Sequence, residues 1–331
     1  MSLPAYLDPL YTAEEMRAAD RFAIEECGVD SLALMERAGS GLARAVARVV
    51  PSGMVRVVVG GGHNGADGLV AARVLRAQGR GVDVLAVVAP GDLRGDPQTA
   101  LERLKGASPV RFTPAALVGS AIVVDAMLGT GFEGVPLEPV AGAIAAMNAG
   151  SAPIVAADVP SGLNASTGEA DGPVVQAALT ATNHAPKIGL HVGAGTALAG
   201  RIEVVDIGIP PGGPAVATAG LITARARQAA SGEAVPTSRA PIVVVSPAQL
   251  GHRLGIAEEE VQRRPLQVVR SAAEHTSAVI VLLVARALVA APGGPIAVSA
   301  GPTPAELPTR IDALLETSHD TFAAAAAALA G

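Results

Sequence analysis

The stretch from Val55 to Val70 constrains the fold of this chain more than any other. It begins with the β-branched run Val55–Val59, which is typical of a central strand that is covered on both faces. It continues through a glycine-rich turn into a helical pattern, with Asn64 and Asp67 at the helix start. Glycine allows positive φ and a close approach of backbone to ligand, and the turn contains Gly60, Gly61, Gly62 and Gly65. We therefore interpret this strand, turn and helix as a ligand site.

The chemistry of this turn is constrained by Asp67. Gly60, Gly62 and Gly65 can be aligned with the dinucleotide fingerprint G-x-G-x-x-G. However, a carboxylate in the turn repels a phosphate unless a cation or a ribose hydroxyl interacts with it. The apolar segment Val84–Val88 also lacks the acidic residue expected about 20 residues after such a turn. Both observations disfavour a dehydrogenase.

Composition narrows the class of protein. The 331 residues suffice for one large or two medium domains. The net charge of −6 gives no electrostatic signal for nucleic acid or an anionic membrane. The single cysteine, Cys27, fits a reducing, cytoplasmic compartment, and we expect it to be a small buried residue. The N-terminus lacks a secretory signal pattern, and the apolar run Ala278–Ala291 is too short to span a bilayer.

Regular alternation of strands and helices begins at residue 55. Two helices, at about 12–26 and 32–50, are predicted before it, and the first has the capping-box spacing Thr12 to Glu15. Strands separated by helices predict a mostly parallel sheet with helices on both faces. The predicted strands are 55–59, 82–88, 109–112, 121–125, 153–158, 178–182 and 201–206, and the helices between them are 67–78, 96–105 and 137–148.

The unusual polar residues follow four of these strands. In an open α/β sheet the carboxyl ends of parallel strands share one edge, where ligands bind. We therefore expect four clusters to converge on one crevice. They are His63, Asn64 and Asp67 after one strand, Asp125 with the loop Gly129–Gly131 after another, Asp158 and Ser161 after a third, and Asn183, His184 and Lys187 after a fourth.

Two kinds of chemistry are indicated by these residues. Asn64, Asp125 and Ser161 offer only oxygen ligands, which suits a hard monovalent or alkaline-earth cation rather than zinc. Lys187 follows a buried strand, where a lysine is more often directed at an anion or a reacting group than at solvent. For single residues the alternatives stay open: Asp125 could cap a loop, and Lys187 could lie on the surface.

Six segments in this order resemble the NAD(P)H-hydrate epimerase family (YjeF N-terminal domain), over about residues 10–211. They are Leu34–Gly39, Gly62–Arg73, Val124–Gly131, Ala157–Asn164, Ala185–Leu190 and Val205–Pro210. The resemblance implies a Rossmann-like three-layer αβα sandwich that is often dimeric. It also implies interconversion of the R and S epimers of hydrated NADH and NADPH in nicotinamide nucleotide repair.

Roles for individual residues also come from this resemblance. A potassium ion would be held by Asn64, Asp125 and Ser161, and Asp158 would be the acid/base group with Lys187 in support. The family turn is usually Asn-Asn-Gly-Gly-Asp, so His63 and Ala66 depart from it, and Ala66 requires negative φ. The implied substrate contacts are His63, Asn64, Gly65, Ala66, Asp67, Gly129, Thr130, Gly131, Phe132, Glu133, Gly134, Val135 and Asp158.

The rest of the chain suggests a second, smaller region. We predict an epimerase domain over 1–211, a linker with at most one short helix over 212–240, and a truncated region over 241–331. That last region resembles a degenerate remnant of the ADP/ATP-dependent NAD(P)H-hydrate dehydratase, which has a ribokinase-like fold. Val284-Ala285 stands where that family has Lys-Gly, and Gly301–Asp312 lacks its Gly-Thr-Gly-Asp turn. Without that turn there is no nest for a nucleotide phosphate, so we predict no dehydratase activity.

Two alternatives to a single-activity epimerase follow from the same residues. A bifunctional repair enzyme would keep dehydratase activity in residues 222–331. A non-catalytic scaffold would keep only the fold, but it would not need Asp125, Asp158, Ser161 and Lys187 in one crevice.

Overall fold

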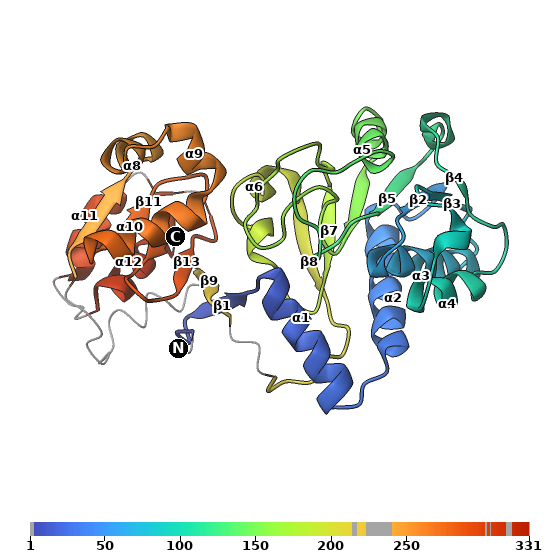
Figure 1. The fold of residues 1–331 in the computed structure, drawn as a ribbon, viewed down its shortest axis with the longest axis horizontal. Coiled ribbons are helices and arrows are strands. Elements are labelled where there is room, and N and C mark those ends of the chain that lie inside the picture. The colour runs from blue at the N-terminus through green and yellow to red at the C-terminus, as the bar shows by residue number, and fades with distance from the viewer. Residues whose placement is uncertain are drawn as a thin grey trace.

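The computed structural model contains two α/β units side by side (Figure 1). It describes residues 3–213, 217–222, 240–301, 303–304, 306–315 and 320–330. Each unit has its own sheet and its own hydrophobic core. None of the helices in these ranges is long and apolar enough to cross a membrane.

The first unit is built on a seven-stranded sheet in which every neighbouring pair is parallel. The strand order is β4-β3-β2-β5-β6-β7-β8, so the order reverses between β2 and β5. This is the switch point at which such sheets bind ligands. The strands are β2 (Val55–Val59), β3 (Val82–Ala86), β4 (Val110–Arg111), β5 (Ile122–Ala126), β6 (Ile154–Ala157), β7 (Leu179–Asn183) and β8 (Arg201–Val205).

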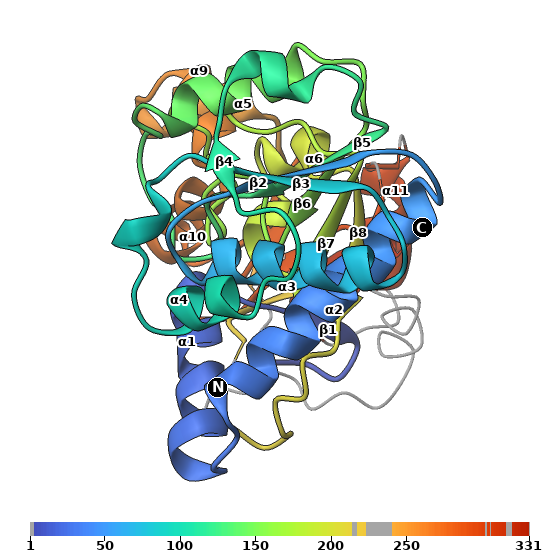
Figure 2. The ribbon, with the colours of Figure 1, turned by 90° about the vertical axis from the view of Figure 1, so that its right-hand side faces the viewer.

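Helices cover both faces of this sheet, which confirms the predicted three-layer αβα sandwich. On one face lie α2 (Ser31–Val49), α3 (His63–Ala77) and α4 (Asp96–Glu102), and on the other lies α5 (Val140–Asn148) (Figure 2). Side chains of β2 alternate between the two layers: Val57 packs with the first group and Val58 with α5. A strand buried on both faces needs the continuous valine run seen in the sequence.

The N-terminal helix α1 (Ala13–Arg21) begins at the predicted capping box. Thr12 Oγ1 accepts a hydrogen bond from the Glu15 amide at 3.2 Å, and Glu15 Oε2 accepts one from the Thr12 amide at 2.7 Å. The helix continues as one π-helical turn, Phe22–Glu26. Cys27, which follows it, is exposed, so our expectation of a buried cysteine is wrong.

The second unit contains a mixed six-stranded sheet of order β1-β9-β13-β12-β11-β10. Helices α8 (Pro247–Leu254), α9 (Glu258–Arg263) and α10 (Pro265–Thr276) supply the core on one face, and α11 (Leu307–Leu315) and α12 (Thr321–Leu329) the core on the other. The strands are β1 (Leu7–Leu10), β9 (Ala219–Ile222), β10 (Ile242–Val245), β11 (Val279–Leu282), β12 (Leu288–Ala290) and β13 (Ile296–Val298).

Two strands of this second sheet come from parts of the sequence that we did not assign to it. Strand β1 precedes α1, and β9 lies inside the range 212–240 that we expected to be a linker. Both are only four residues long, Leu-Asp-Pro-Leu and Ala-Gly-Leu-Ile. They lack the run of β-branched residues that marks a strand in sequence. Residues 223–239 of the expected linker lie outside the described part of the chain.

Candidate active site

The glycine turn after β2 serves close packing rather than unusual backbone angles. None of Gly60, Gly61, Gly62 and Gly65 has positive φ, which corrects our expectation. A Cβ on Gly60 would lie 2.2 Å from the Met127 carbonyl oxygen, and one on Gly65 would lie 2.1 Å from the Gly60 carbonyl oxygen. Gly60 therefore lets the turn approach the loop that follows β5, and Gly65 lets the start of α3 pack against the turn.

Helix α3 begins at His63, four residues earlier than we predicted, so the whole turn motif forms its first turn. Residues 64–67 are buried and His63 is exposed. Ala66 is helical and donates a backbone hydrogen bond to the Gly62 carbonyl at 3.1 Å, so its φ is negative as this residue requires. The departure from the usual glycine is thus accommodated without strain.

Two of the three residues expected at a cation, Asn64 and Ser161, lie at one backbone carbonyl, that of Leu128, and Ser161 links this carbonyl to the third, Asp125. Asn64 Nδ2 donates to it at 2.8 Å, and Ser161 Oγ lies 3.3 Å from it. Ser161 also donates to both carboxylate oxygens of Asp125, from its hydroxyl at 2.6 Å and its amide at 2.7 Å. The side-chain oxygen of Asn64 is buried and has no hydrogen-bond partner within the described ranges.

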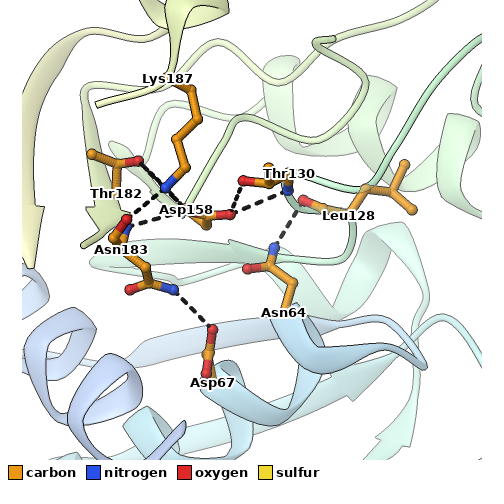
Figure 3. A network of polar contacts seen from close by, with 8 residues as sticks. All are labelled: Asn64, Asp67, Leu128, Thr130, Asp158, Thr182, Asn183 and Lys187. Atoms are coloured by element: carbon orange, nitrogen blue, oxygen red, sulfur yellow. Dashed lines mark hydrogen bonds and ion pairs between the residues drawn. The ribbon is translucent and has the colours of Figure 1, made fainter. Parts of the chain in front are cut away.

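Asp158 lies at the centre of a second polar group and accepts hydrogen bonds from two loops (Figure 3). Its φ of 63° places it in the left-handed region, which Asp tolerates better than most residues. Oδ2 accepts from the amide of Thr130 at 3.2 Å and from its hydroxyl. Oδ1 accepts from the Asn183 amide at 3.1 Å. The residue is 9% exposed, so this buried carboxylate still reaches the surface.

Lys187 is the cation of this group and is 1% exposed. Its Nζ lies 2.6 Å from Asp158 Oδ1, 3.0 Å from Thr182 Oγ1 and 2.7 Å from the Asn183 carbonyl oxygen. Three acceptors satisfy the three protons of an ammonium group. The sequence-based alternative of a surface lysine is therefore wrong.

Asp67 joins the group through Asn183, whose Nδ2 donates to Asp67 Oδ2 at 3.2 Å (Figure 3). The pKa of Asp67 is raised well above its ordinary value, first by burial and then by the charge of Asp158. For Asp158, burial alone raises the pKa, but the charge of Lys187 and the hydrogen bonds of Lys187, Thr130 and Asn183 together lower it. Two buried carboxyl groups bridged by one asparagine thus favour opposite protonation states.

The environment of Asp125 differs from those of Asp67 and Asp158. Its pKa is raised to about 6, because burial outweighs the hydrogen bonds from Ser161 and Met127. Among the residues that the structure describes, no positive side chain contributes to this balance. A buried carboxylate of this kind is stabilised by a bound cation.

The loop Gly129–Val135 lies at the rim of this edge of the sheet. Thr130 contacts Asp158, whereas Gly131 and Glu133–Val135 are exposed and Phe132 is half-buried. Gly129 packs against Asn64: a Cβ there would lie 3.2 Å from the Asn64 side chain. The loop therefore connects the Asn64 group to the Asp158 group.

Sequence reasoning missed two residues that take part in this site, Thr182 on β7 and Asp20 on α1. Asn183 was expected at this edge of the sheet, and it forms hydrogen bonds to both Asp67 and Asp158. The pKa of Asp20 is raised mainly by burial and also by Asp158, while the charges of Lys187 and His63 lower it. The one sequence signal for Asp20 is its position one helical turn after buried Met16.

The geometry can support acid/base chemistry on a bound molecule. One carboxyl group with a raised pKa and one with a lowered pKa face the same edge of the sheet, with a set of oxygen ligands beside them. Within the described ranges, no group of three His, Cys, Asp or Glu side chains could hold a metal ion. Any cation here would therefore depend on amide, hydroxyl and carbonyl oxygens in addition to Asp125.

Comparison with known proteins places residues 31–189 in the family described as YjeF-related protein N-terminus. Over 201 residues the chain is 41% identical to the NAD(P)H-hydrate epimerase of Limosilactobacillus fermentum, covering 59% of this chain and 95% of that protein. It is 34% identical over 220 residues to the NAD(P)H-hydrate epimerase of Rhodopirellula baltica, covering 63% of this chain and 88% of that protein.

Longer relatives also match the chain. The bifunctional NAD(P)H-hydrate repair enzyme Nnr of Salinibacter ruber is 41% identical over 227 residues, covering 62% of this chain and 42% of that protein. The match to the corresponding enzyme of Moorella thermoacetica is also 41% identical and covers 41% of that protein. The chain thus spans about two-fifths of the length of these bifunctional relatives.

Proposed function

The chain belongs to the YjeF N-terminal family, which includes NAD(P)H-hydrate epimerases, and on this premise we propose that it interconverts the R and S epimers of hydrated NADH and NADPH. The observation that supports the proposal most is the pairing of two buried carboxyl groups, Asp67 and Asp158. Asn183 forms hydrogen bonds to both, and the Lys187 ammonium group forms an ion pair with Asp158. A scaffold would not require a buried lysine with three polar acceptors.

The reaction inverts a ring carbon that carries a hydroxyl group beside the ring nitrogen. The lone pair of that nitrogen expels the hydroxyl as water once a proton is supplied, and this leaves a cation. Water then returns to the other face and releases a proton. In our assignment Asp67, whose pKa is raised, supplies the proton, while ionised Asp158 stabilises the cation and accepts the proton from the returning water. Proton exchange with solvent then reprotonates Asp67 and deprotonates Asp158, which restores the starting state.

Lys187 keeps Asp158 ionised and fixed in place. Its ammonium group donates a hydrogen bond to Asp158 Oδ1, and the Thr130 amide donates one to Asp158 Oδ2. Such preorganisation removes the cost of orienting the carboxylate during the reaction. The substrate would lie against the start of α3 and the loop Gly129–Val135, since these two segments flank Asp158 at the switch point of the sheet.

A potassium ion is the cation that we propose for the oxygen set beside Asp125. The unpartnered buried oxygen of Asn64, the carboxylate of Asp125, the Leu128 carbonyl and the Ser161 hydroxyl fit a hard monovalent ion. Such an ion would supply positive charge for substrate phosphate oxygens and hold the β5 loop in place. We also propose a homodimer, as the family resemblance implies, and a cytoplasmic location, which the single cysteine, Cys27, fits.

For the second unit we propose a remnant of the dehydratase domain without dehydratase activity. The support lies in the sequence: Val284-Ala285 follows β11, where the dehydratase has Lys-Gly. Incubation of the protein with S-hydrate and ADP or ATP should therefore regenerate no NADH. Recovery of NADH would favour the bifunctional alternative.

The test of the main proposal is chiral separation of the two hydrates. Pure S-hydrate is incubated with the protein in potassium buffer and, in parallel, in tetramethylammonium buffer. We expect R-hydrate to appear in potassium and more slowly without it. No conversion under either condition would refute the proposed activity, and equal rates would refute the potassium assignment alone.

A further inference from the structure

The segment that carries Lys187 is held by the residue that follows the first strand of the second sheet. The Tyr11 amide donates to the Pro186 carbonyl at 3.0 Å, and the Ile188 amide donates to the Tyr11 carbonyl at 3.0 Å. Tyr11 and Lys187 thereby form an isolated parallel bridge. These two bonds fix the backbone on both sides of the lysine.

Tyr11 follows directly on β1, so the clamp on Lys187 extends the second sheet. All four residues of β1 pair with β9, from Leu7 opposite Ile222 to Leu10 opposite Ala219. Strand β9 in turn pairs with β13. In Figure 1, β1 and β9 lie in the second unit, and α1 leads from them to the first unit.

The residue after the lysine packs into the hydrophobic core of the second unit. Ile188 is 4% exposed and belongs to the same cluster of buried side chains as Leu10, Val245 and Leu250. Val192, one turn further on, lies in that cluster too. The side chain of residue 188 is thus buried by the second unit, while that of residue 187 points into the candidate active site.

Polar contacts also join the segment after Lys187, and helix α1, to the second unit. Arg286, which follows β11, contacts His191 with 3.0 Å between Nη1 and Nδ1. The pKa of His191 is lowered to about 4 by burial and by the charge of Arg286, so Nδ1 is a neutral acceptor. The Thr218 amide, next to β9, donates to Glu15 Oε1 of α1 at 3.0 Å. A cavity of about 440 Å³ lies at this junction, between Val192 and Arg286.

We propose that the second unit is a positioning element for Lys187: its sheet, through β1 and Tyr11, and its core, through Ile188, set the position of the lysine ammonium group on Asp158. This rests on the proposed epimerase function and assigns to the second unit a role that needs no nucleotide and no dehydratase chemistry. Tyr11 and Ile188 act through the lysine backbone and touch no reacting atom.

The test compares two isoleucine truncations in the full chain. Ile188→Ala removes the anchor beside the lysine. Ile311→Ala removes the same atoms from a site that is 3% exposed, but from the core on the opposite face of the second sheet. Both variants open a cavity in the second unit, and only the first lies on the path to Lys187. Thermal unfolding establishes a temperature at which both are folded.

At that temperature we expect Ile188→Ala to lower kcat by about 10- to 100-fold, since small misplacements of catalytic groups have effects of this size. KM should change little. The acid limb of the kcat profile should move to higher pH, because Asp158 loses part of the charge that lowers its pKa. Ile188→Val should restore most of the rate, and Ile311→Ala should keep the wild-type kcat and pH profile.

Other outcomes distinguish the positioning role of the second unit from the proposed epimerase activity. Wild-type kcat and an unshifted acid limb in Ile188→Ala would overturn the positioning role while leaving the epimerase proposal intact. Equal losses in Ile188→Ala and Ile311→Ala would overturn it as well, since the effect would then reflect general loosening. Wild-type protein without epimerase activity would refute the proposed function itself. If Ile188→Ala does not fold, the acid limbs of Ile188→Val and Ile311→Val are compared instead. A shift to higher pH in Ile188→Val alone would support the positioning role, and the same profile in both variants would overturn it.

Discussion

Replacing Lys187 with methionine should destabilise the fold and abolish most of the activity. The substitution keeps an unbranched side chain but removes the ammonium group and its three contacts at 2.6, 3.0 and 2.7 Å. Asp158 is then left as a buried charge without its partner. Breaking a buried ion pair by removing one partner costs about 3–5 kcal/mol of unfolding free energy.

The loss of unfolding free energy in Lys187→Met should depend on pH. The pKa of Asp158 is lowered in the folded wild-type protein, with Lys187 as the main lowering influence. Its contribution to stability is therefore present above the pKa of the unfolded chain and is lost as pH falls through the folded pKa. In Lys187→Met the carboxylate gains no such benefit. The variant should differ most from wild type near neutral pH and approach it in acid.

Urea unfolding between pH 3 and 8 measures this difference, and the chain provides a matched control. Lys105, its only other lysine, is exposed, so Lys105→Met removes the same charge without touching the site. We expect Lys105→Met to change the unfolding free energy by less than about 0.5 kcal/mol. If Lys187→Met matched Lys105→Met in stability and in epimerase rate, our account of the Asp158 environment would be refuted.

Three further predictions concern the glycine turn and the two polar groups. Asp67→Asn should remove the basic limb of the kcat profile, where activity falls as the raised pKa of Asp67 is passed and its proton is lost; a basic limb that persists would assign the acid elsewhere. Gly65→Ala should lower the unfolding free energy by about 1–3 kcal/mol, since its Cβ would lie 2.1 Å from the Gly60 carbonyl oxygen. Thermal unfolding tests this against Gly62→Ala, whose Cβ would meet no atom of the described residues within 4 Å apart from its chain neighbours. Asn64→Ala should weaken the stabilisation of the fold by potassium. The measurement is the rise in Tm when tetramethylammonium buffer without sodium is replaced by potassium buffer, and this rise should be smaller in the variant than in the wild type. The same rise in both proteins would exclude Asn64 as a ligand.

The first unit was predictable because its sequence signals are local and strong. The valine run of β2 and the turn before α3 identify a central parallel strand, and parallel strands bring their carboxyl ends to one edge. That rule alone predicts that Asn64, Asp125, Asp158 and Lys187 lie close together. Asn183, which bridges two carboxylates, was only one of several polar residues at a strand end, and nothing local distinguished it.

The features that sequence reasoning missed depend on pairing between distant segments. Strands β1 and β9 are paired across more than 200 residues, and neither has an alternating or β-branched pattern of its own. The proximity of Asp20 to Lys187 depends on how α1 is placed by β1, so it could not be inferred either. The glycine turn was misjudged because a sequence does not show whether glycine is needed for positive φ or for close packing.

In the proposed mechanism Asp158, held ionised by Lys187, takes part in inverting the hydrated carbon of the nicotinamide ring. The most direct measurement is the rate at which pure S-hydrate of NADH is converted to R-hydrate by the wild-type protein and by Asp158→Asn, with folding verified by thermal unfolding. We predict conversion by the wild type and a loss of about 10²-fold or more in the folded variant. A folded Asp158→Asn protein with a near wild-type rate would contradict the account.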